Sequence, residues 1–255
     1  MVFATSSLFP TDGVGLLFFD EVNRAAVLTQ NALFQIVLDR KSGAYTLPKG
    51  WTPVAAGNRE TDGGGVIKMP QALANRFIHL HLEPNADDWC KWAIRSGIDP
   101  ILIGFMRWRP ELLYKFSNTE HAFPTPRSWS FVSKIINKNS SDEVEHALIA
   151  GAVGHGATIE FQSFVNTYRN LPNIDRILTM PNEAPTPTDV AQLYAISSAL
   201  ASRAKADNLE AIITYLNRLQ VEYAVSCIKD ATLRDPMLCT ERSYAEWATF
   251  HSDII

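Results

Sequence analysis

The chain has 255 residues, of which 46% are hydrophobic and 20% charged, and its formal net charge is -4. These values are typical of a folded protein of one or two domains, and they exclude wholesale disorder. The acidic balance argues against a general binder of nucleic acid or anionic membranes, because phosphate neutralisation needs clustered Lys and Arg. The early apolar run at residues 14–19 is far too short to span a bilayer, and the three cysteines form no CxxC pair. We therefore expect a reduced, cytoplasmic setting.

The first part of the chain carries three short apolar runs, at residues 15–19, 51–56 and 77–82, which predict buried strands. Apolar side chains at helical spacing over residues 26–39 predict a helix after the first run, and Pro70 begins a short helix before the third. Continuous apolar strands separated by helices are typical of a parallel sheet that is covered on both faces. This order of elements predicts an α/β core.

Helices follow one another after the third run. Asn85 and Thr125 are favoured helix N-caps, and Ser140 with Glu143 three residues later predicts a capping box. Periodic apolar positions predict further helices beyond these, with a proline-rich linker at residues 181–187. We expect three regions, namely an α/β core at residues 1–84, a helical region at 85–170 and a second helical region at 171–255.

Two carboxylates follow the first predicted strand without a break. Asp20 and Glu21 stand at its carboxyl end, where open α/β sheets place their ligands. One carboxylate can hold a hydrated Mg²⁺ through its water shell, and its neighbour can orient or deprotonate a water molecule. Asn58 follows the second strand and can align such a water without adding charge. The alternatives are a strand that ends at the surface with two solvated acids, and an Asn that serves only a turn.

Two arginines add candidate cations. Arg76 ends the short helix before the third run, where a cation suits the helix dipole or can be presented to the phosphate of a neighbouring subunit. Arg127 lies in the first turn of the helix that begins after Thr125, where the dipole disfavours a cation by roughly a few tenths of a kcal/mol. A cation tolerated there often has an anionic partner such as a phosphate, and pairing with a nearby acid explains it about equally well.

Four parts of the chain together resemble the MoxR-like AAA+ ATPases. Residues 15–24 and 29–33 are similar to their Walker B strand and following helix, and residues 54–60 are similar to their sensor 1 strand. Residues 72–77 resemble the helix that bears the arginine finger, and residues 125–129 resemble the sensor 2 helix of the lid. The motifs occur in the family's order and at its spacing; each is weak alone, and together they are specific.

The resemblance implies a site for ATP and Mg²⁺ that is shared between subunits. In such a site Asp20 coordinates Mg²⁺, Glu21 is the base that activates water, and Asn58 is sensor 1. Arg76 acts in trans on the γ-phosphate of an adjacent subunit, and Arg127 contacts the bound nucleotide in cis. The family also implies a homo-oligomeric, hexameric ring that remodels partner proteins alongside proteins with a von Willebrand factor A-type domain.

One motif of the family has no match in this sequence. The loop G-x-x-x-x-G-K-[ST] cradles phosphates with backbone amides and a Lys, whereas the glycine run at residues 63–65 lacks that Lys and follows the Walker B segment. We therefore expect an incomplete α/β AAA+ core, N-terminally truncated before the Walker B strand and lacking the Walker A strand, followed by an all-α lid and a helical C-terminal extension. A gap should open beside the second strand, and unpaired strand edges should favour association. ATP hydrolysis by this chain alone should be weak or absent.

Two other functions stay open. A non-catalytic interaction subunit of an AAA+ ring would use Arg76 and the helical C-terminal region, and it would bind no nucleotide of its own. A metal-dependent nuclease would use Asp20 and Glu21, but the sequence lacks the basic surface that DNA requires. Nucleotide binding separates the ATPase from the first alternative, and salt-dependent DNA binding would favour the second.

Overall fold

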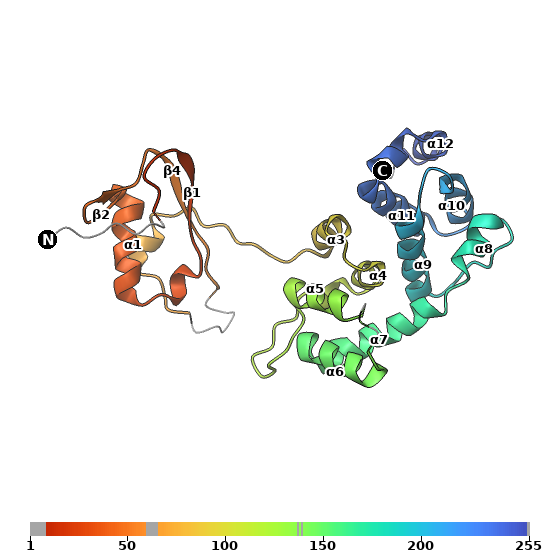
Figure 1. Ribbon diagram of the computed structural model, residues 1–255, viewed down its shortest axis with the longest axis horizontal. Helices are drawn as coiled ribbons and strands as arrows, with labels where there is room; N and C mark the ends of the chain where they lie inside the picture. The colour runs from red at the N-terminus through yellow and green to blue at the C-terminus, as the bar shows by residue number, and fades with distance from the viewer. Residues whose placement is uncertain (1–8, 60–65, 137, 139, 254–255) are drawn as a thin grey trace. The chain divides into compact units, whose positions relative to one another are not determined.

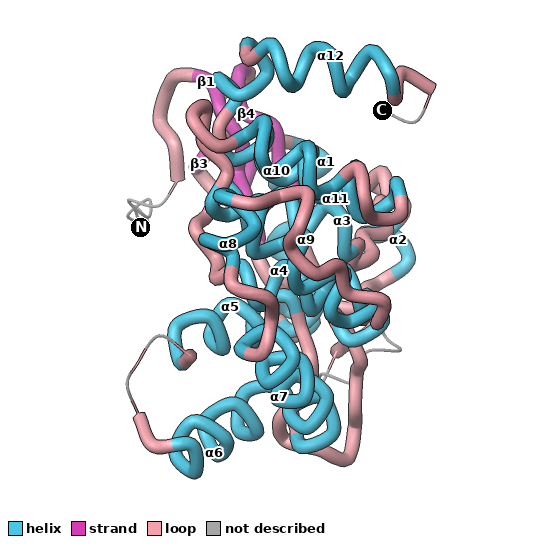
Figure 2. Tube along the Cα trace, turned by 90° about the vertical axis from the view of Figure 1, so that its right-hand side faces the viewer, coloured by secondary structure: helices cyan, strands magenta, loops and turns pink. Residues whose placement is uncertain are grey.

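A computed structural model describes residues 9–59, 66–136, 138 and 140–253 of the chain, so the glycine run at 63–65 lies outside the described residues. The chain divides into two compact units, Met1–Leu82 and Glu83–Ile255 (Figure 1). Within the described residues, the first unit holds the strands and the second consists of helices and loops (Figure 2). No helix among the described residues is both long enough and apolar enough to cross a membrane. The coarse prediction of a small parallel sheet with many helices is therefore confirmed.

The first unit is built around one parallel strand pair. Its elements are β1 (Val14–Phe19), a 3-10 helix (Val22–Arg24), α1 (Val27–Asp39), β2 (Lys41–Ser42), β3 (Tyr45–Thr46), β4 (Gly50–Ala55) and α2 (Gln71–Ala74). Strands β1 and β4 lie side by side in parallel, with Phe19 opposite Ala55, and β2 and β3 form a separate short hairpin. The carboxyl ends of the first two predicted strands therefore meet at one end of the sheet.

The core of the first unit lies on one face of this sheet. Alternate residues of a strand point to opposite faces, and Leu17 of β1 is buried together with Ile36 of α1 and Leu47. Among the described residues of this unit, only five hydrophobic residues are buried: Leu17, Val22, Ile36, Leu47 and Leu73. The first unit therefore has a small core.

The prediction that the sheet is covered on both faces is wrong for the described residues. Val14, Leu16 and Phe18 lie on the opposite face from Leu17, and each residue is between 57% and 82% exposed. The reason is that a sheet face is buried only when other elements pack against it. In this unit the core forms on the face that carries Leu17. An apolar run shows that a strand can be buried, but it does not supply the covering layer.

The third predicted strand is also wrong. Residues 77–82 form no strand, and Ile78, Leu80 and Leu82 are each more than 80% exposed. At the start of this run, the ring Nε2 of His79 lies 2.8 Å from the carbonyl oxygen of Ala74. A strand exists only through hydrogen bonds to a neighbour, and neither β1 nor β4 pairs with this run. Among the described residues β4 pairs with β1 alone, so its other edge is open, as the gap expected beside the second strand requires.

The second unit is a helical body. Its α-helices are α3 (Ala86–Arg95), α4 (Pro100–Trp108), α5 (Pro126–Ile135), α6 (Asp142–Val153), α7 (His155–Arg169), α8 (Ile174–Thr179), α9 (Val190–Arg203), α10 (Leu209–Leu216), α11 (Val221–Arg234) and α12 (Arg242–Phe250). Its described residues also form two 3-10 helices, Pro110–Leu112 and Pro236–Thr240. The residues before and after position 170 belong to this one unit.

Helix starts in the second unit follow local side-chain chemistry. Asn85 accepts a hydrogen bond from the backbone N–H of Asp88 at 3.0 Å and caps α3, as the sequence predicts. Thr125 caps α5 and forms a reciprocal capping box with Ser128. The capping box predicted at Ser140 is wrong, because α6 begins after Ser141, whose side chain makes no capping bond.

The predicted linker at residues 181–187 is held against the second unit. The Tyr215 hydroxyl donates to the carbonyl of Pro185 at 2.8 Å, and the Arg218 guanidinium donates to the carbonyl of Ala184 at 2.8 Å. Ala184 itself is fully buried. Prolines here shape a packed connection between α8 and α9, so the segment does not separate two domains.

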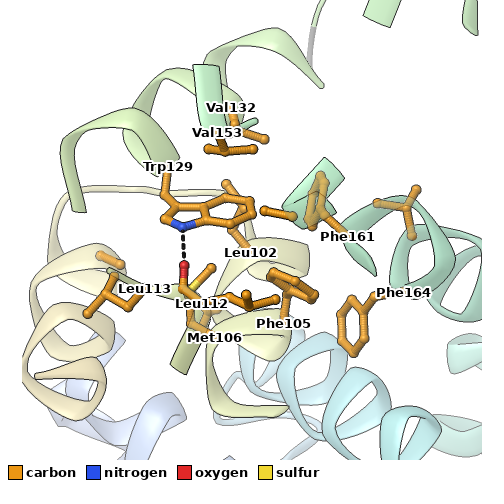
Figure 3. Close-up of a cluster of buried hydrophobic side chains, with 14 of the residues drawn as sticks. Leu102, Phe105, Met106, Leu112, Leu113, Trp129, Val132, Val153, Phe161 and Phe164 are labelled. Carbon is orange, nitrogen blue, oxygen red and sulfur yellow. Dashed lines mark hydrogen bonds between the residues drawn. The ribbon is translucent and has the colours of Figure 1, made fainter. Parts of the chain in front are cut away.

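An aromatic cluster fills the first of two hydrophobic cores in the second unit (Figure 3). Trp129 of α5 is fully buried, and its ring centroid lies 5.3 Å from that of Phe105 and 5.6 Å from that of Phe161. Its indole Nε1 donates to the carbonyl oxygen of Leu112 at 2.8 Å. The cluster therefore combines a large buried apolar area with a satisfied polar group.

Helix α9 belongs to both cores of the second unit. It contributes Ala195 to the first core and Ile196 and Leu200 to the second, which also includes α10 and α11. It packs closely on α4, where a Cβ at Gly104 would lie 3.1 Å from the Cβ of Ser198. Small side chains thus let this helix fit between its neighbours.

One ion pair joins α4 to α11 beneath the surface. The Nε and Nη2 of Arg107 donate to the two carboxylate oxygens of Asp230, at 3.0 and 2.5 Å. Only 7% of the Asp230 side chain is exposed, and burial raises the pKa of its carboxyl while the Arg107 guanidinium opposes the rise. The pair ties two helices more than a hundred positions apart in the sequence.

Candidate functional site

The acidic pair stands on a strained turn at the carboxyl end of β1. Asp20 and Glu21 are both exposed, and the Oδ1 of Asp20 accepts a hydrogen bond from the backbone N–H of Glu21 at 2.9 Å. Glu21 has φ 50° and ψ 38°, a left-handed conformation that a residue other than glycine adopts at a cost of about 1–3 kcal/mol. Strain of this kind is frequent at functional sites and is consistent with a role for Glu21 beyond a surface turn.

Arg24 engages the carboxylate of Glu21. The Nη1 of Arg24 lies 3.2 Å from both carboxylate oxygens, and about half of each side chain is exposed. An exposed pair of this kind contributes about 0–1 kcal/mol, so a stronger anion can displace the carboxylate. Arg24 was not among the predicted site residues, although an acid and an Arg three residues apart are a recognisable signal in the sequence.

Asn23 joins the acidic turn to the segment that follows β4. Its Nδ2 donates to the carbonyl oxygen of Asn58 at 2.6 Å, and its Oδ1 accepts from the backbone N–H of Asn58 at 3.2 Å. Two backbone hydrogen bonds of 2.9 Å, from Val22 to Ala56 and from Ala56 to Phe19, extend the strand pairing to the same point. Asp20, Glu21 and Asn58 are thereby brought to one end of the sheet.

The side chain of Asn58 is left free by this arrangement. Asn23 takes up the backbone of Asn58, and the carboxamide of Asn58 is exposed and makes no hydrogen bond within the described residues. A carboxamide can both donate to and accept from water. The end of the sheet therefore presents two carboxylates and one neutral amide to solvent.

Of the two predicted arginines, Arg76 belongs to the first unit. Arg76 is exposed after α2, and its guanidinium lies 5.3 Å from the ring centroid of Phe34 on α1, a cation–π contact. No hydrogen bond or ion pair among the described residues joins it to Asp20, Glu21 or Asn58. Its action on a neighbouring subunit stays a prediction.

Arg127 belongs to the second unit. It is exposed in the first turn of α5 and forms no ion pair with a described acid. The pairing alternative considered for it therefore gains no support from the described residues. Its contact with nucleotide also stays a prediction.

The acidic end of the sheet offers few metal ligands of its own. In the described ranges, no group of three or more His, Cys, Asp and Glu side chains could hold a metal ion. Mg²⁺ commonly takes only one or two carboxylates and keeps several waters, so Asp20 and Glu21 are sufficient in kind for Mg²⁺ and insufficient for a closed metal cage. One carboxylate oxygen of Asp20 is already used by the Glu21 amide.

Two hollows in the second unit contain none of the predicted site residues. One of about 620 Å³ lies between α10, α11 and α12, and one of about 370 Å³ lies beside Arg107. Neither therefore bears on the predicted nucleotide site.

Comparison with known proteins identifies no relative. No protein-family model matches the chain, and neither a curated protein nor a solved structure matches it.

Proposed function

We propose that this chain carries the magnesium- and water-handling part of a MoxR-like AAA+ ATPase site, in a cytoplasmic protein that couples ATP hydrolysis to the remodelling of partner proteins. The observation that supports this proposal most is the meeting of Asp20, Glu21 and Asn58 at the carboxyl end of two parallel strands. In open α/β sheets, ligands bind at the carboxyl ends of the strands.

Each of the three side chains has a role that suits its chemistry. Asp20 would hold Mg²⁺, and Mg²⁺ would neutralise charge on the phosphates of ATP. Glu21 would take a proton from the attacking water once its carboxylate is released from Arg24. Asn58 would orient that water through its uncharged carboxamide, which makes no hydrogen bond to the residues that the structure describes. Arg76 would complete the site of a neighbouring subunit in a homo-oligomeric, hexameric ring, and Arg127 would contact the nucleotide in cis.

The expected activity of the chain alone is weak. Phosphate binding in this kind of site depends on a glycine-rich loop with its Lys, and the 255 residues contain no such motif. ATP should therefore bind through Mg²⁺ and Asp20 with low affinity, and turnover should be slow or undetectable. A partner with a von Willebrand factor A-type domain is part of the same proposal.

The test is nuclear magnetic resonance of the full chain with ATP and Mn²⁺ in place of Mg²⁺. Paramagnetic Mn²⁺ should broaden the amide signals of Asp20, Glu21 and Asn58, and it should do so more strongly when ATP is present. Asp20→Asn should abolish this broadening. The control is Asp88→Asn, which changes another exposed aspartate in the first turn of α3.

Three results would contradict the proposal. The first is a wild type that shows no ATP-dependent broadening, the second is ATP-dependent broadening that leaves Asp20 untouched, and the third is equal broadening in wild type and Asp20→Asn. Fast turnover by the chain alone, lost in Glu21→Gln, would contradict the expected impairment while supporting the assignment of the base.

A non-catalytic subunit of an AAA+ ring is the second candidate. The engagement of Glu21 by Arg24 and the missing phosphate loop favour it. The Mn²⁺ experiment separates the two candidates, because a non-catalytic subunit would show no ATP-dependent broadening at Asp20.

A further inference from the structure

We infer that Asn23 is a positioning residue, which sets the place of Asn58 relative to the acidic pair. The functional part of this inference rests on the proposed function, in which Asn58 orients the attacking water and Glu21 is the base. Its geometric part rests on contacts within the first unit alone.

The contact between Asn23 and Asn58 is reciprocal. The carboxamide of Asn23 donates through Nδ2 at 2.6 Å and accepts through Oδ1 at 3.2 Å, and both bonds go to the backbone of Asn58. We call these two hydrogen bonds the Asn23 clamp. The backbone carbonyl of Asn23 also accepts from the N–H of Ile67 at 2.8 Å, so the residue holds two returning segments.

Few other side chains can form the Asn23 clamp. It needs one donor and one acceptor side by side at the end of a short stem, which is the carboxamide of Asn. An ionised Asp has two acceptors and no donor, so it would meet the carbonyl of Asn58 with a lone pair. Gln carries the same group one methylene further out. The chemistry of the contact therefore selects the residue type.

Gly57 is the steric partner of the Asn23 clamp. A Cβ at Gly57 would lie 2.5 Å from the Oδ1 and 2.8 Å from the Cγ of Asn23. These are atoms of a side chain already held by two hydrogen bonds, so the collision would displace the clamp. Gly57 and Asn23 thus offer two independent ways to disturb the position of Asn58.

The clamp also explains why the backbone of Asn58 is fixed while its side chain stays available. Asn23 lies three residues after Asp20 and two after Glu21, within the same turn. A displacement of Asn23 would therefore move Asn58 away from the carboxylates without removing any of the three side chains. This separates positioning from direct participation.

The experiment follows the amide of Asn58 in the full chain by nuclear magnetic resonance. In Asn23→Ala, loss of the hydrogen bond should speed solvent exchange of this amide by about three- to tenfold. In Asn23→Asp, the signal should return toward its wild-type position as the pH falls through about 4, because the protonated acid regains a donor. Gly57→Ala should shift the same signal. The control is Asn31→Asp on α1, in which the signal of the Asn58 amide should match that of the wild type at every pH.

The functional readout is the Mn²⁺ broadening with ATP. Asn23→Ala should keep the broadening at Asp20 and reduce it severalfold at Asn58, since only the latter has moved. A wild type without any broadening at Asp20 overturns the proposed function but leaves the clamp to be judged by the amide data. An Asn58 amide that responds to neither Asn23→Ala nor the pH of Asn23→Asp overturns the inference, as does equal loss of broadening at Asp20 and Asn58. Melting of each variant identifies unfolding, and Asn23→Asp, which keeps the shape of the side chain, decides the question if Asn23→Ala unfolds.

Discussion

Replacing Arg107 with Met would leave the carboxylate of Asp230 without its hydrogen-bond donor. Arg107 serves both carboxylate oxygens, and the Asp230 side chain is nearly inaccessible to water. Breaking a buried pair by removing one partner costs about 3–5 kcal/mol, because an uncompensated charge stays buried. The second ion pair of Arg107, with the exposed Asp87 at 3.3 Å, adds at most about 1 kcal/mol.

Protonation of Asp230 sets an upper limit to this loss. Neutralising an aspartate with an ordinary pKa of 3.8 at pH 7 costs about 4 kcal/mol, at about 1.4 kcal/mol for each pH unit. We therefore expect Arg107→Met to lose about 3–4 kcal/mol of unfolding free energy at pH 7.

The loss should depend on pH in a defined direction. Burial raises the pKa of Asp230 above its ordinary value, and removal of the opposing Arg107 raises it further. A raised folded pKa lowers stability only as the pH rises from the unfolded value through the folded one. At pH 4 the loss should therefore shrink to about 1 kcal/mol.

Denaturant unfolding at both pH values, followed by tryptophan fluorescence, measures the difference between variant and wild type. Five of the six tryptophans lie in the second unit, so the signal reports mainly on the unit that contains the pair. The double variant Arg107→Met/Asp230→Leu should recover most of the stability at pH 7, because no charge is left buried. An equal loss at pH 7 and pH 4 in the single variant would refute the reasoning.

Three further outcomes are expected. Trp129→Phe should lower the unfolding free energy by about 2–4 kcal/mol in calorimetry, because the carbonyl of Leu112 loses its donor and a void opens; a loss under about 1 kcal/mol would show that the site repacks. At pH 8 an aromatic disulfide reagent should label the exposed Cys239 in the native chain but not Cys90, since burial raises the pKa of the Cys90 thiol to about 12, and rapid labelling of Cys90 would count against that burial. Leu16→Thr should change stability by less than about 1 kcal/mol yet reduce self-association in sedimentation velocity, because it makes the exposed face of β1 more polar; unchanged association would mean that this face plays no part in it.

The helices were predictable where their causes are local. Asn85 and Thr125 cap helices through hydrogen bonds that span three residues, and such signals are visible in a short window of sequence. The capping box predicted at Ser140 was wrong because its neighbour Ser141 occupies the N-cap position. Boundaries shift by a residue when two capping residues stand side by side.

The sheet was less predictable because its causes are distant. The run at residues 77–82 has the composition of a strand, but a strand needs a partner that composition does not identify. The meeting of Asp20 with Asn58 could be foreseen from the order of parallel strands. The role of Asn23 in holding Asn58 could not be foreseen, because its hydrogen bonds reach across 35 positions to backbone atoms, which carry no sequence signal.

Helix α9 restricts how this protein can vary. Ala195 and Ile196 are adjacent in the chain, yet each faces a different core. A larger side chain introduced to improve one core would tilt the helix and open a void in the other, so acceptable substitutions must satisfy two sets of neighbours at once. Mutational tolerance along the buried positions of α9 should accordingly be low, and compensating changes should arise in pairs drawn from α4 and α11.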